Sequence, residues 1–226
     1  MDRRLVQSLL LIAILGTGCG PAPTAPAPTA GIEGVIPLPT PALSGPMPLE
    51  EALARRRSVR EFDTIPLTRA ELGQLLWAAQ GITDERGFRT APSAGALYPL
   101  EIYAVTADGV FHYEPQGHRL SQVSAGDARQ ALQQAALDQT AVGRAPAVFV
   151  IAAVYERTAR KYGAERSPRY VHLEAGHAAQ NLLLEAVALG LGAVPIGAFD
   201  DREVQQVLGL PADHEPLYLI PTGHPQ

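Results

Sequence analysis

The sequence of 226 residues contains a single cysteine, Cys19, and no excess of positive charge. One cysteine excludes an internal disulfide bond and any zinc or iron–sulfur centre built from several thiolates. The formal net charge of -5 gives no sign of the basic surface that nucleic-acid-binding proteins use, so we expect no nucleic-acid partner. The 6 histidines include no pair with the HExxH spacing, and we therefore expect no metal site.

Two further patterns are missing from the sequence. No GxGxxG segment follows an apparent strand, which argues against a dinucleotide-binding Rossmann domain. The apolar run at residues 9–15 is too short to span a bilayer, because spanning needs roughly 20 residues. The hydrophobic content of 46% nevertheless suits a domain with a real core.

Residues 1–19 have the pattern of an export signal. Arg3 and Arg4 give a positively charged start, a short apolar run follows, and small residues precede Cys19. This arrangement resembles the lipobox of bacterial lipoproteins, which implies lipidation of Cys19 and attachment to a membrane on its periplasmic or cell-surface side. The alternative is export without the anchor, as a secreted or periplasmic protein.

Residues 20–46 are rich in proline, alanine and threonine. Proline lacks a backbone donor and fixes its own φ angle, so we expect this linker to form neither helices nor sheet ladders and to behave as a semi-extended tether. The tether would hold a folded domain, residues 47–226, away from a membrane surface.

Residues 47–226 predict a mixture of helices and strands. Thr68 and Glu71 have the spacing of a capping box, and Pro168 stands in the first turn of the longest expected helix. The expected helices are at 48–57, 68–80, 127–138, 167–189 and 201–208, and the expected strands at 100–106, 110–113, 147–154, 193–198 and 216–221. This order indicates an α+β fold with a mixed, mostly antiparallel sheet flanked by helices, one of them long and central.

Residues 55–60 hold four arginines and one serine. Guanidinium groups bind phosphate through two parallel hydrogen bonds, and a hydroxyl adds a neutral donor. A solvated basic turn is the alternative. Because neighbouring arginines repel one another, we interpret their clustering in an acidic protein as an anion site.

Two other segments have residue types suited to chemistry. Small residues around Ser93 and Gly95, between prolines, would let a stiff backbone approach a flat ligand, although a plain surface loop has the same pattern. Lys161 beside Tyr162 offers a pair of proton donors, and a solvated pair at a helix end is the alternative interpretation.

Polar residues interrupt the long helix, which is otherwise rich in leucine and alanine. Their spacing places several of them one turn apart on shared faces. They favour a role at a dimer or ligand interface, and a hydrogen-bonded network in the core is equally compatible with the pattern. The residues are His172, Glu174, His177, Gln180 and Asn181.

In their order and spacing, these segments resemble the nitroreductase superfamily and, within it, the SagB-type dehydrogenases that form thiazole and oxazole rings in peptides. The resemblance extends over residues 51–223, and its most specific stretches are RRSVREF at 56–62, PSAGALYPLEIY at 92–103, KYG at 161–163, EAGHAAQNLLLEAVALGLGAVPIGAFDD at 174–201 and LIPTG at 219–223. It implies a nitroreductase-like α+β fold, bound FMN, and a homodimer with FMN at the subunit interface.

The resemblance also implies roles for single residues in FMN binding. Arg56 and Ser58 would hold the phosphate, and Arg57 would lie along the ribityl chain and ring. Arg60 would face the pyrimidine edge, where a cation stabilises the negative charge of the reduced flavin. The backbone of Gly197 and Ala198 would face N5.

A loop and a residue pair complete the implied site. The loop would reach the flavin from the partner subunit through Pro92, Ser93, Ala94, Gly95 and Leu97. Lys161 and Tyr162 match the lysine–tyrosine pair of azoline oxidases, which assists proton removal while the flavin takes up hydride.

We therefore expect an FMN-dependent oxidoreductase that passes hydride from a small-molecule donor to a small-molecule acceptor. NAD(P)H with a nitroaromatic or quinone acceptor is one pair of substrates, and a heterocycle with oxygen is another. Two alternatives stay open on the sequence: an exported lipoprotein that keeps the fold as a binding module without redox turnover, and an enzyme that consumes flavin.

Overall fold

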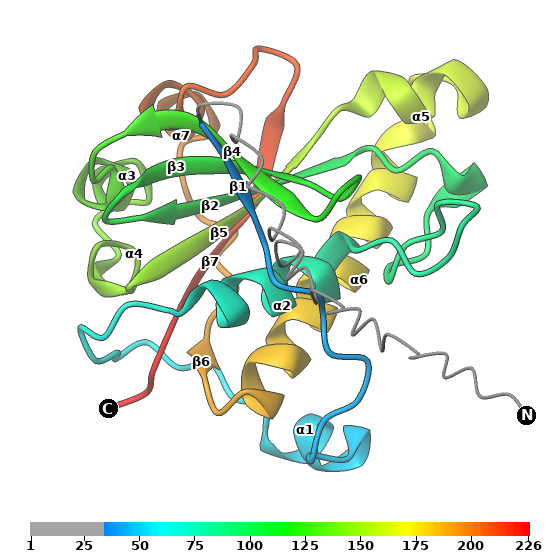
Figure 1. Ribbon diagram of the computed structural model, residues 1–226. Helices are drawn as coiled ribbons and strands as arrows, with labels where there is room; N and C mark the ends of the chain where they lie inside the picture. Colours follow the sequence, from blue (N-terminus) through cyan, green and yellow to red (C-terminus); the bar gives the residue numbers. More distant parts are fainter. Residues whose placement is uncertain (1–33) are drawn as a thin grey trace, which may run out of the picture. The chain divides into compact units, whose positions relative to one another are not determined.

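The computed structural model describes residues 34–226 (Figure 1). The expected export signal, Cys19 and most of the proline-rich linker lie outside the described residues. No helix within residues 34–226 combines the length and the apolar character needed to cross a membrane.

A seven-stranded sheet forms the centre of the domain, in the order β1-β4-β3-β2-β5-β7-β6. Each pair of neighbouring strands is antiparallel. The strands are β1 Val35–Pro37, β2 Leu100–Thr106, β3 Gly109–Glu114, β4 Arg119–Ala125, β5 Ala147–Ala153, β6 Gly192–Ala193 and β7 Glu215–Gly223. The predicted α+β class with a mostly antiparallel sheet is confirmed.

Helices cover both faces of this sheet (Figure 1). One core lies between the sheet and helices α2 and α6, and a second core lies between the sheet and helices α3, α4 and α7. The helices are α1 Leu49–Arg55, α2 Arg69–Gln80, α3 Arg129–Ala135, α4 Thr140–Arg144, α5 Tyr155–Tyr162, α6 Ser167–Ala188 and α7 Asp201–Leu208, with a short 3₁₀ turn at Ala94–Ala96.

Strand β5 explains why the two cores form. All seven of its residues are buried, as the continuous apolar run at 147–154 predicted. Successive side chains of a strand point to opposite faces, so Phe149 and Ile151 enter the core with α2 and α6. Val148 and Val150 enter the core with α3, α4 and α7.

The helix ends follow the local sequence signals. The Thr68 hydroxyl accepts a hydrogen bond from the Glu71 amide, and the Glu71 carboxylate accepts one from the Thr68 amide, which confirms the capping box of α2. Asp200 caps α7 through a 2.9 Å bond from the Glu203 amide to Oδ1. Pro168 lies in the first turn of α6, whose 22 residues end one residue before the predicted end at 189.

The expectation that residues 20–46 form no sheet ladder is wrong at β1. Val35, Ile36 and Pro37 pair with Ser121, Leu120 and Arg119 of β4. Ile36 also packs against the core with α2 and α6. A proline is tolerated here because β1 is an edge strand and its unpaired side needs no amide donor.

Other differences from the predicted elements have local causes. Strand β4 was not predicted because its residues are mostly polar, and only Leu120 of the strand is buried. Of the expected strand at 193–198, only Ala193 belongs to β6, since Pro195 has no amide to donate, and a single bridge joins Ile196 to Leu219. Helix α3 ends at Ala135, before Leu137 and Asp138 take left-handed backbone angles.

Two short helices, α4 and α5, were not predicted at all. In α5 only Thr158 is buried, so the sequence has too few apolar residues to show a helical period. Its C-terminal end contains Lys161 and Tyr162, which are therefore a pair at a helix end.

Candidate active site

The predicted phosphate-binding segment, residues 56–60, lies against β6. The Val59 amide donates to the Ala193 carbonyl at 3.1 Å, and Ser58 forms a parallel bridge with Ala193. A methyl group on Gly192 would come within 2.6 Å of Val59 Cγ1, so only glycine permits this close approach.

Two further predicted flavin contacts lie on the segment between β6 and α7. Gly197 and Ala198, expected to face N5, are exposed and lie between Ile196, which bridges Leu219 of β7, and the start of α7. The position of a methyl group on Gly197 is open, with no heavy atom within 4 Å, so a flat ligand could reach its backbone. The Ala198 carbonyl already accepts a 2.8 Å bond from Gln139 Nε2.

The arginines of this segment, and Arg55 before it, differ in whether their guanidinium groups already bond to other groups of the chain. Arg55 pairs with Glu51 at 2.5 Å on the surface of α1. Arg57 Nη1 donates to the carbonyls of Ala54 and Arg56 at 3.0 and 2.7 Å and so closes the end of that helix. Arg60 is exposed, as is Ser58. We place these residues, with Arg56, in the first half-site, which consists of 56–60 and 197–198.

The second predicted loop and the lysine–tyrosine pair meet at Gly95. The backbone of Gly95 is left-handed, with φ at 66°, and a methyl group there would lie 2.8 Å from Lys161 Nζ and 3.0 Å from the Tyr162 hydroxyl oxygen. Ala96 and Tyr98 also have positive φ angles. The loop is therefore a tight, strained turn that presses its backbone against two polar side chains of α5.

Lys161 is the only lysine among the 226 residues. It is exposed, and its Nζ lies 5.5 Å from the centre of the Tyr162 ring. The Tyr162 ring contacts that of Tyr170 on α6, with 4.7 Å between centroids. The second half-site consists of residues 92–97 with Lys161 and Tyr162.

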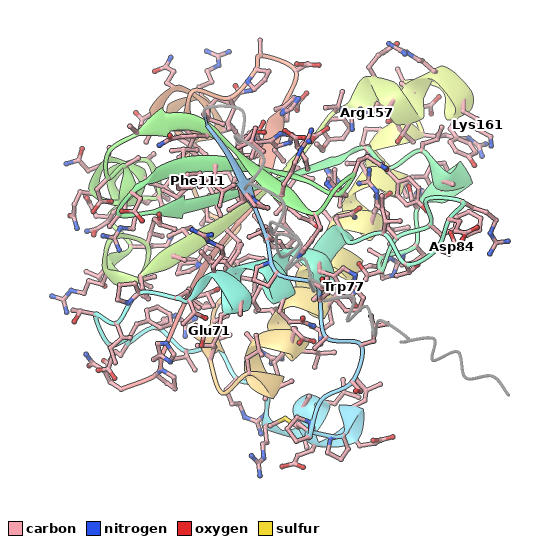
Figure 2. All side chains as sticks on the ribbon, viewed as in Figure 1. Glu71, Trp77, Asp84, Phe111, Arg157 and Lys161 are labelled. Carbon is pink, nitrogen blue, oxygen red and sulfur yellow. The ribbon has the colours of Figure 1, made fainter. Side chains whose placement is uncertain are left out.

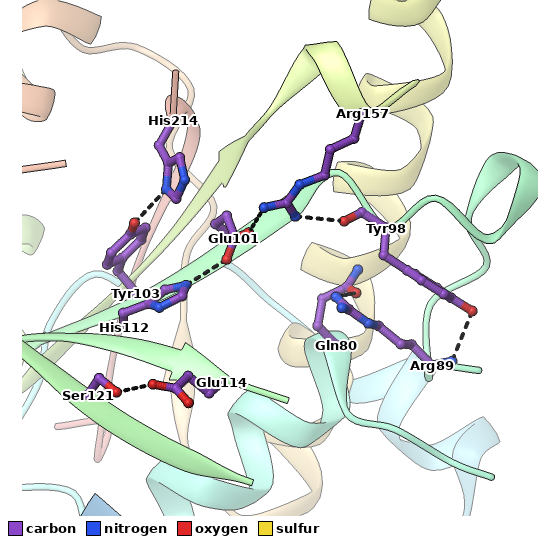
Figure 3. A network of polar contacts seen from close by, with 10 residues as sticks. All are labelled: Gln80, Arg89, Tyr98, Glu101, Tyr103, His112, Glu114, Ser121, Arg157 and His214. Carbon is purple, nitrogen blue, oxygen red and sulfur yellow. Dashed lines mark hydrogen bonds and ion pairs between the residues drawn. The ribbon is translucent and has the colours of Figure 1, made fainter. Parts of the chain in front are cut away.

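An ion-pair network that the sequence did not reveal fixes this half-site to the sheet (Figure 3). Arg157, one turn before Lys161 on α5, donates to the Tyr98 carbonyl at 3.1 Å and to the Glu101 carboxylate. His112 Nε2 lies 2.6 Å from the other oxygen of Glu101. Burial opposes ionisation of Glu101, but the bonds from His112 and Arg157 hold the pKa of its carboxyl below the ordinary value.

One signal in the sequence could have pointed to this network. Glu101 is an acidic residue in an otherwise apolar strand, β2, and a charge in a buried strand needs a partner. Figure 2 shows Arg157 and Lys161 on the same helix, with Lys161 at its outer end. Arg157 therefore joins α5, the helix that contains Lys161, to β2 of the sheet.

The sequence left open whether the polar residues of α6 lie at an interface or in a hydrogen-bonded core network, and the structure shows some exposed and some bonded inside the chain. His177 and Gln180 are exposed. Asn181 Nδ2 donates to the Thr90 carbonyl at 3.3 Å, and Glu174 is buried with only 3% of its surface exposed. His172 bonds to the Tyr155 hydroxyl at 2.7 Å and stays exposed.

Residues 56–60 of the first half-site and the whole second half-site lie near opposite ends of α6 (Figure 1). The second half-site adjoins the N-terminal part of this helix, where Tyr162 meets Tyr170. The first half-site adjoins β6, which begins four residues after α6 ends at Ala188. A helix of 22 residues is about 33 Å long at 1.5 Å per residue, so residues 56–60 and the turn at Gly95 lie far apart within one chain.

The cavity of about 380 Å³ beside the start of α2 is separate from both half-sites. It lies next to the β1 edge of the sheet and contains an arginine that is bonded to Asp127. Its lining includes Ile36, Leu72, Phe111, Leu120 and Arg129. The half-sites themselves are surface features of the single chain.

The family model described as "Nitroreductase family" matches residues 53–224 of this chain. The chain belongs to the nitroreductase family. A protein of Methanocaldococcus jannaschii, named provisionally as a nitroreductase, is 49% identical over 181 residues, covering 77% of this chain and 90% of the relative. A solved nitroreductase-type structure from Ralstonia eutropha is 33% identical, with a TM-score of 0.77, and the match covers 86% of this chain and 90% of the other.

A third relative is similar over a shorter region. The trifolitoxin-processing protein TfxB of Rhizobium leguminosarum is 31% identical over 138 residues, which is 57% of this chain and 37% of that protein. The family settles the fold and the general class, that of flavin-dependent oxidoreductases, whose members generally bind FMN and are typically homodimers. The exposed arginines and the open backbone at Gly197 fit such a cofactor.

Proposed function

We propose that two copies of this chain bind FMN at their interface and transfer hydride from a small-molecule donor to a small-molecule acceptor. The observation that supports this proposal is the separation of the half-sites along α6. In a twofold-symmetric dimer, the first half-site of one chain can meet the second half-site of its partner. Each dimer would then have two complete sites.

The first half-site would bind the cofactor. Arg56 and Ser58 hold the phosphate in this proposal, Arg57 lies along the ribityl chain, and Arg60 faces the pyrimidine edge. The exposed backbone at Gly197 and Ala198 faces the reactive edge of the ring. Bound FMN supplies the site that accepts and returns hydride, and the cation at Arg60 stabilises its reduced form.

The second half-site would position the substrate and hold a proton. Pro92, Ser93, Ala94 and Leu97 surround the turn at Gly95 and close the flavin pocket from the partner chain. Lys161 Nζ and the Tyr162 hydroxyl converge on this turn and can donate or accept a proton beside the reacting atoms. The pair, together with the similarity to TfxB, supports a dehydrogenase of the SagB type that acts on a heterocycle.

The general nitroreductase activity is the second candidate, favoured by the 49% identity to the Methanocaldococcus relative. In that case NAD(P)H is the donor, and a nitroaromatic or quinone is the acceptor. The two candidates use the same half-sites and differ in which substrate reduces the flavin.

Exposed apolar side chains support the dimer. Leu49 and Leu53 of α1 are 61% and 52% exposed, and Leu173 of α6 is 57% exposed. Large apolar groups on neighbouring helices are typical of a surface that another subunit covers. Helix α1 leads directly into the first half-site, and Leu173 lies beside Glu174 near the second.

Export and lipidation of Cys19 are a separate proposal from the sequence, since the described residues begin after this part of the chain. Under this proposal the enzyme is attached to the outer face of a cytoplasmic membrane or to the cell surface. Mass spectrometry of the protein from its membrane fraction would detect the added acyl mass on Cys19, and an unmodified N-terminal peptide there would contradict lipidation.

Cofactor binding tests the central proposal. We expect the purified chain to contain FMN or to bind it stoichiometrically, with the absorption spectrum of a flavoprotein. Arg60→Ala should weaken FMN binding roughly tenfold to a hundredfold, because it removes a charged hydrogen-bond donor. Arg202→Ala, which removes an exposed arginine of α7, is the matched control. A wild-type protein that takes up no FMN would contradict the proposal.

The single lysine gives a test of the second half-site that does not depend on turnover. Reductive methylation with ¹³C-formaldehyde labels Lys161 and the N-terminal amine only. We expect the Lys161 signal to shift when FMN is added to the wild type and to stay unchanged when FMN is added to the Gly95→Trp variant, whose bulky side chain blocks the contact. An unchanged wild-type signal at full FMN occupancy would contradict the proposal that Lys161 lies beside the bound FMN.

A further inference from the structure

Residues 224–226, which follow β7, pair with residues 61–63, which follow the arginines of the first half-site. The two stretches run antiparallel and are joined by a backbone bridge close to the end marked C in Figure 1. Within this pairing the Asp63 amide donates to the His224 carbonyl at 2.8 Å. We call residues 224–226 the C-terminal clamp.

Gln226 adds two contacts to the clamp, and both are bonds to backbone carbonyls. Its amide donates to the Glu61 carbonyl at 3.4 Å, and its side-chain Nε2 donates to the Phe62 carbonyl at 3.0 Å. At the other end of the clamp, His224 Nε2 lies 3.8 Å from the carboxylate of Glu71 in the first turn of α2. The clamp is therefore bonded to the backbone that follows the arginines and lies next to the start of α2.

The core keeps the clamp and its partner segment close together. The side chain of Phe62 packs in the core with α3, α4 and α7, and only 4% of this residue is exposed. A methyl group on Gly223, the last residue of β7, would lie 3.2 Å from Phe62 Cβ and 2.5 Å from Pro146 Cδ. The absence of a side chain at position 223 therefore permits the close approach from which the clamp begins.

Arg60 lies between two bonded stretches of backbone. On its N-terminal side, the Val59 amide donates to the Ala193 carbonyl of β6 at 3.1 Å. On its C-terminal side, residues 61–63 are bonded to the clamp. Arg60 itself is exposed. The backbone that presents this guanidinium group is therefore held from both sides within one chain.

We propose that the C-terminal clamp is a positioning element for Arg60, because it holds residues 61–63 in the one conformation that presents this side chain to the flavin. The clamp acts through Arg60 and does not itself touch the cofactor. Its hydrogen bonds belong to the free chain, whereas its effect on FMN binding rests on the proposed function.

The physical basis is the conformational entropy of the segment. A flexible segment loses conformational freedom when it binds a ligand, and this loss weakens binding. The clamp orders the backbone around Arg60 before the ligand arrives and so removes part of that cost. Without the clamp, the Asp63 amide and the carbonyls of Glu61 and Phe62 would bond to water, and the segment would sample other conformations.

Limited trypsin digestion of the FMN-free protein tests the clamp independently of the flavin. Trypsin cleaves after arginine where the chain opens locally, so its rate reports how firmly a segment is held. In a chain that ends at Gly223, we expect cleavage after Arg60 to become roughly tenfold faster, because the bonds of the clamp are lost. Cleavage after Arg202, an exposed arginine of α7, is the internal control and should stay unchanged.

Two results of this digestion would overturn the proposal. One is an unchanged rate of cleavage after Arg60 in the shortened chain. The other is an equal acceleration after Arg60 and Arg202, which would show a general loss of stability in place of a local release.

A double-mutant cycle of FMN affinity tests whether the clamp acts through Arg60. The dissociation constant would be measured for the wild type, the chain that ends at Gly223, Arg60→Ala, and the two changes together. Loss of the clamp should weaken binding roughly tenfold in the wild type and less than about twofold in Arg60→Ala, where no cation is left to position. An equal loss in both backgrounds would contradict the positioning role, since a merely structural clamp predicts additive effects.

A milder variant keeps the proposal testable should the shortened chain fail to fold. Gln226→Ala removes only the side-chain bond to the Phe62 carbonyl, and we expect cleavage after Arg60 to become roughly threefold faster. Gln205→Ala is the matched control, because Gln205 Nε2 donates to the His214 carbonyl at 2.9 Å, on a segment without these arginines. Equal cleavage after Arg60 in the two variants would overturn the proposal.

The two kinds of measurement separate this proposal from the proposed function. A wild type that takes up no FMN contradicts the proposed function, whereas the digestion of the FMN-free chain still decides whether the clamp holds Arg60. A wild type that binds FMN, with affinity unaffected by loss of the clamp, contradicts the clamp alone.

Discussion

At the scale of single residues, Glu174 and Glu203 show how surroundings change the behaviour of one residue type. Glu203 is exposed in the first turn of α7, where an acidic side chain interacts favourably with the helix dipole. Glu174 is buried, and its carboxyl group must lose hydration in order to ionise. Glutamate therefore contributes to stability at position 203 and lowers stability at position 174 once the pH rises above about 4.5.

This contrast predicts how stability depends on pH. The pKa of Glu174 is about 7 in the folded chain and near its ordinary value of 4.5 in the unfolded chain. Below about pH 4.5 both states are protonated and the cost is absent; as the pH rises through 7, the folded state loses a favourable proton. The wild type should therefore lose on the order of 3 kcal/mol of unfolding free energy from this group between about pH 4.5 and pH 8.

Glu174→Gln cannot ionise at this position and should not show that loss. Urea denaturation across this pH range measures the effect, with Glu203→Gln as the exposed control that follows the wild type. The same pH dependence in Glu174→Gln and the wild type would contradict the assignment of this cost to Glu174.

The sequence suggested some residues of the candidate site and gave no indication of others. The arginines of 56–60 and the pair Lys161 and Tyr162 were found from residue type and resemblance, because such groups suit phosphate binding and proton transfer. Arg157 and Glu101 were not, since an ion pair between residues 56 apart leaves no local pattern. Their importance becomes visible only when α5 is placed on the sheet.

At the scale of elements, α2 shows that short-range signals can be sufficient. Its capping box is completed within four residues, and both reciprocal bonds are present. Helix α5 and strand β4 show the opposite case, because their polar sequences have little periodicity of their own and their positions depend on neighbouring strands and helices.

The capping box gives a prediction for α2. Thr68→Ala removes the acceptor for the Glu71 amide and should lower the free energy of unfolding by about 1 kcal/mol. Thr64→Ala is a suitable control, since Thr64 is an exposed threonine four residues earlier and outside the helix. Chemical denaturation measures both. An equal effect of the two substitutions would show that the cap adds nothing specific.

At the scale of the whole molecule, the length of α6 determines how far apart the two half-sites lie. About 33 Å of helix separates residues 56–60 of the first half-site from the second half-site within one chain. The exposed leucines of α1 and α6 then have a ready explanation as the surface that a second copy covers. Dimerisation and cofactor binding would be one event.

Mixing two defective variants tests this arrangement. Arg60→Ala damages the first half-site, and Gly95→Trp damages the second, so neither homodimer has an intact site. A mixed dimer has one site with both defects and one site with none. After random exchange of subunits, about one quarter of the wild-type FMN sites should therefore return.

Absorbance of bound flavin after joint refolding of the two variants measures the recovery. Each variant refolded alone is the control for residual binding. No recovery in the mixture, with mixed dimers verified by mass, would show that both halves of each site come from one chain.

The sequence by itself determined the features that depend on neighbours along the chain: the buried run of β5, the cap of α2, the start of α6 at Pro168 and the segments that resemble the nitroreductase family. Only the tertiary structure decided that β1 joins the sheet and that Gly95 meets Lys161 and Tyr162. It also decided that residues 56–60 of the first half-site and the whole second half-site lie near opposite ends of one helix. The reason is physical: hydrogen bonding and hydrophobic periodicity act over a few residues, whereas these contacts join segments that only the packing of the whole chain brings together.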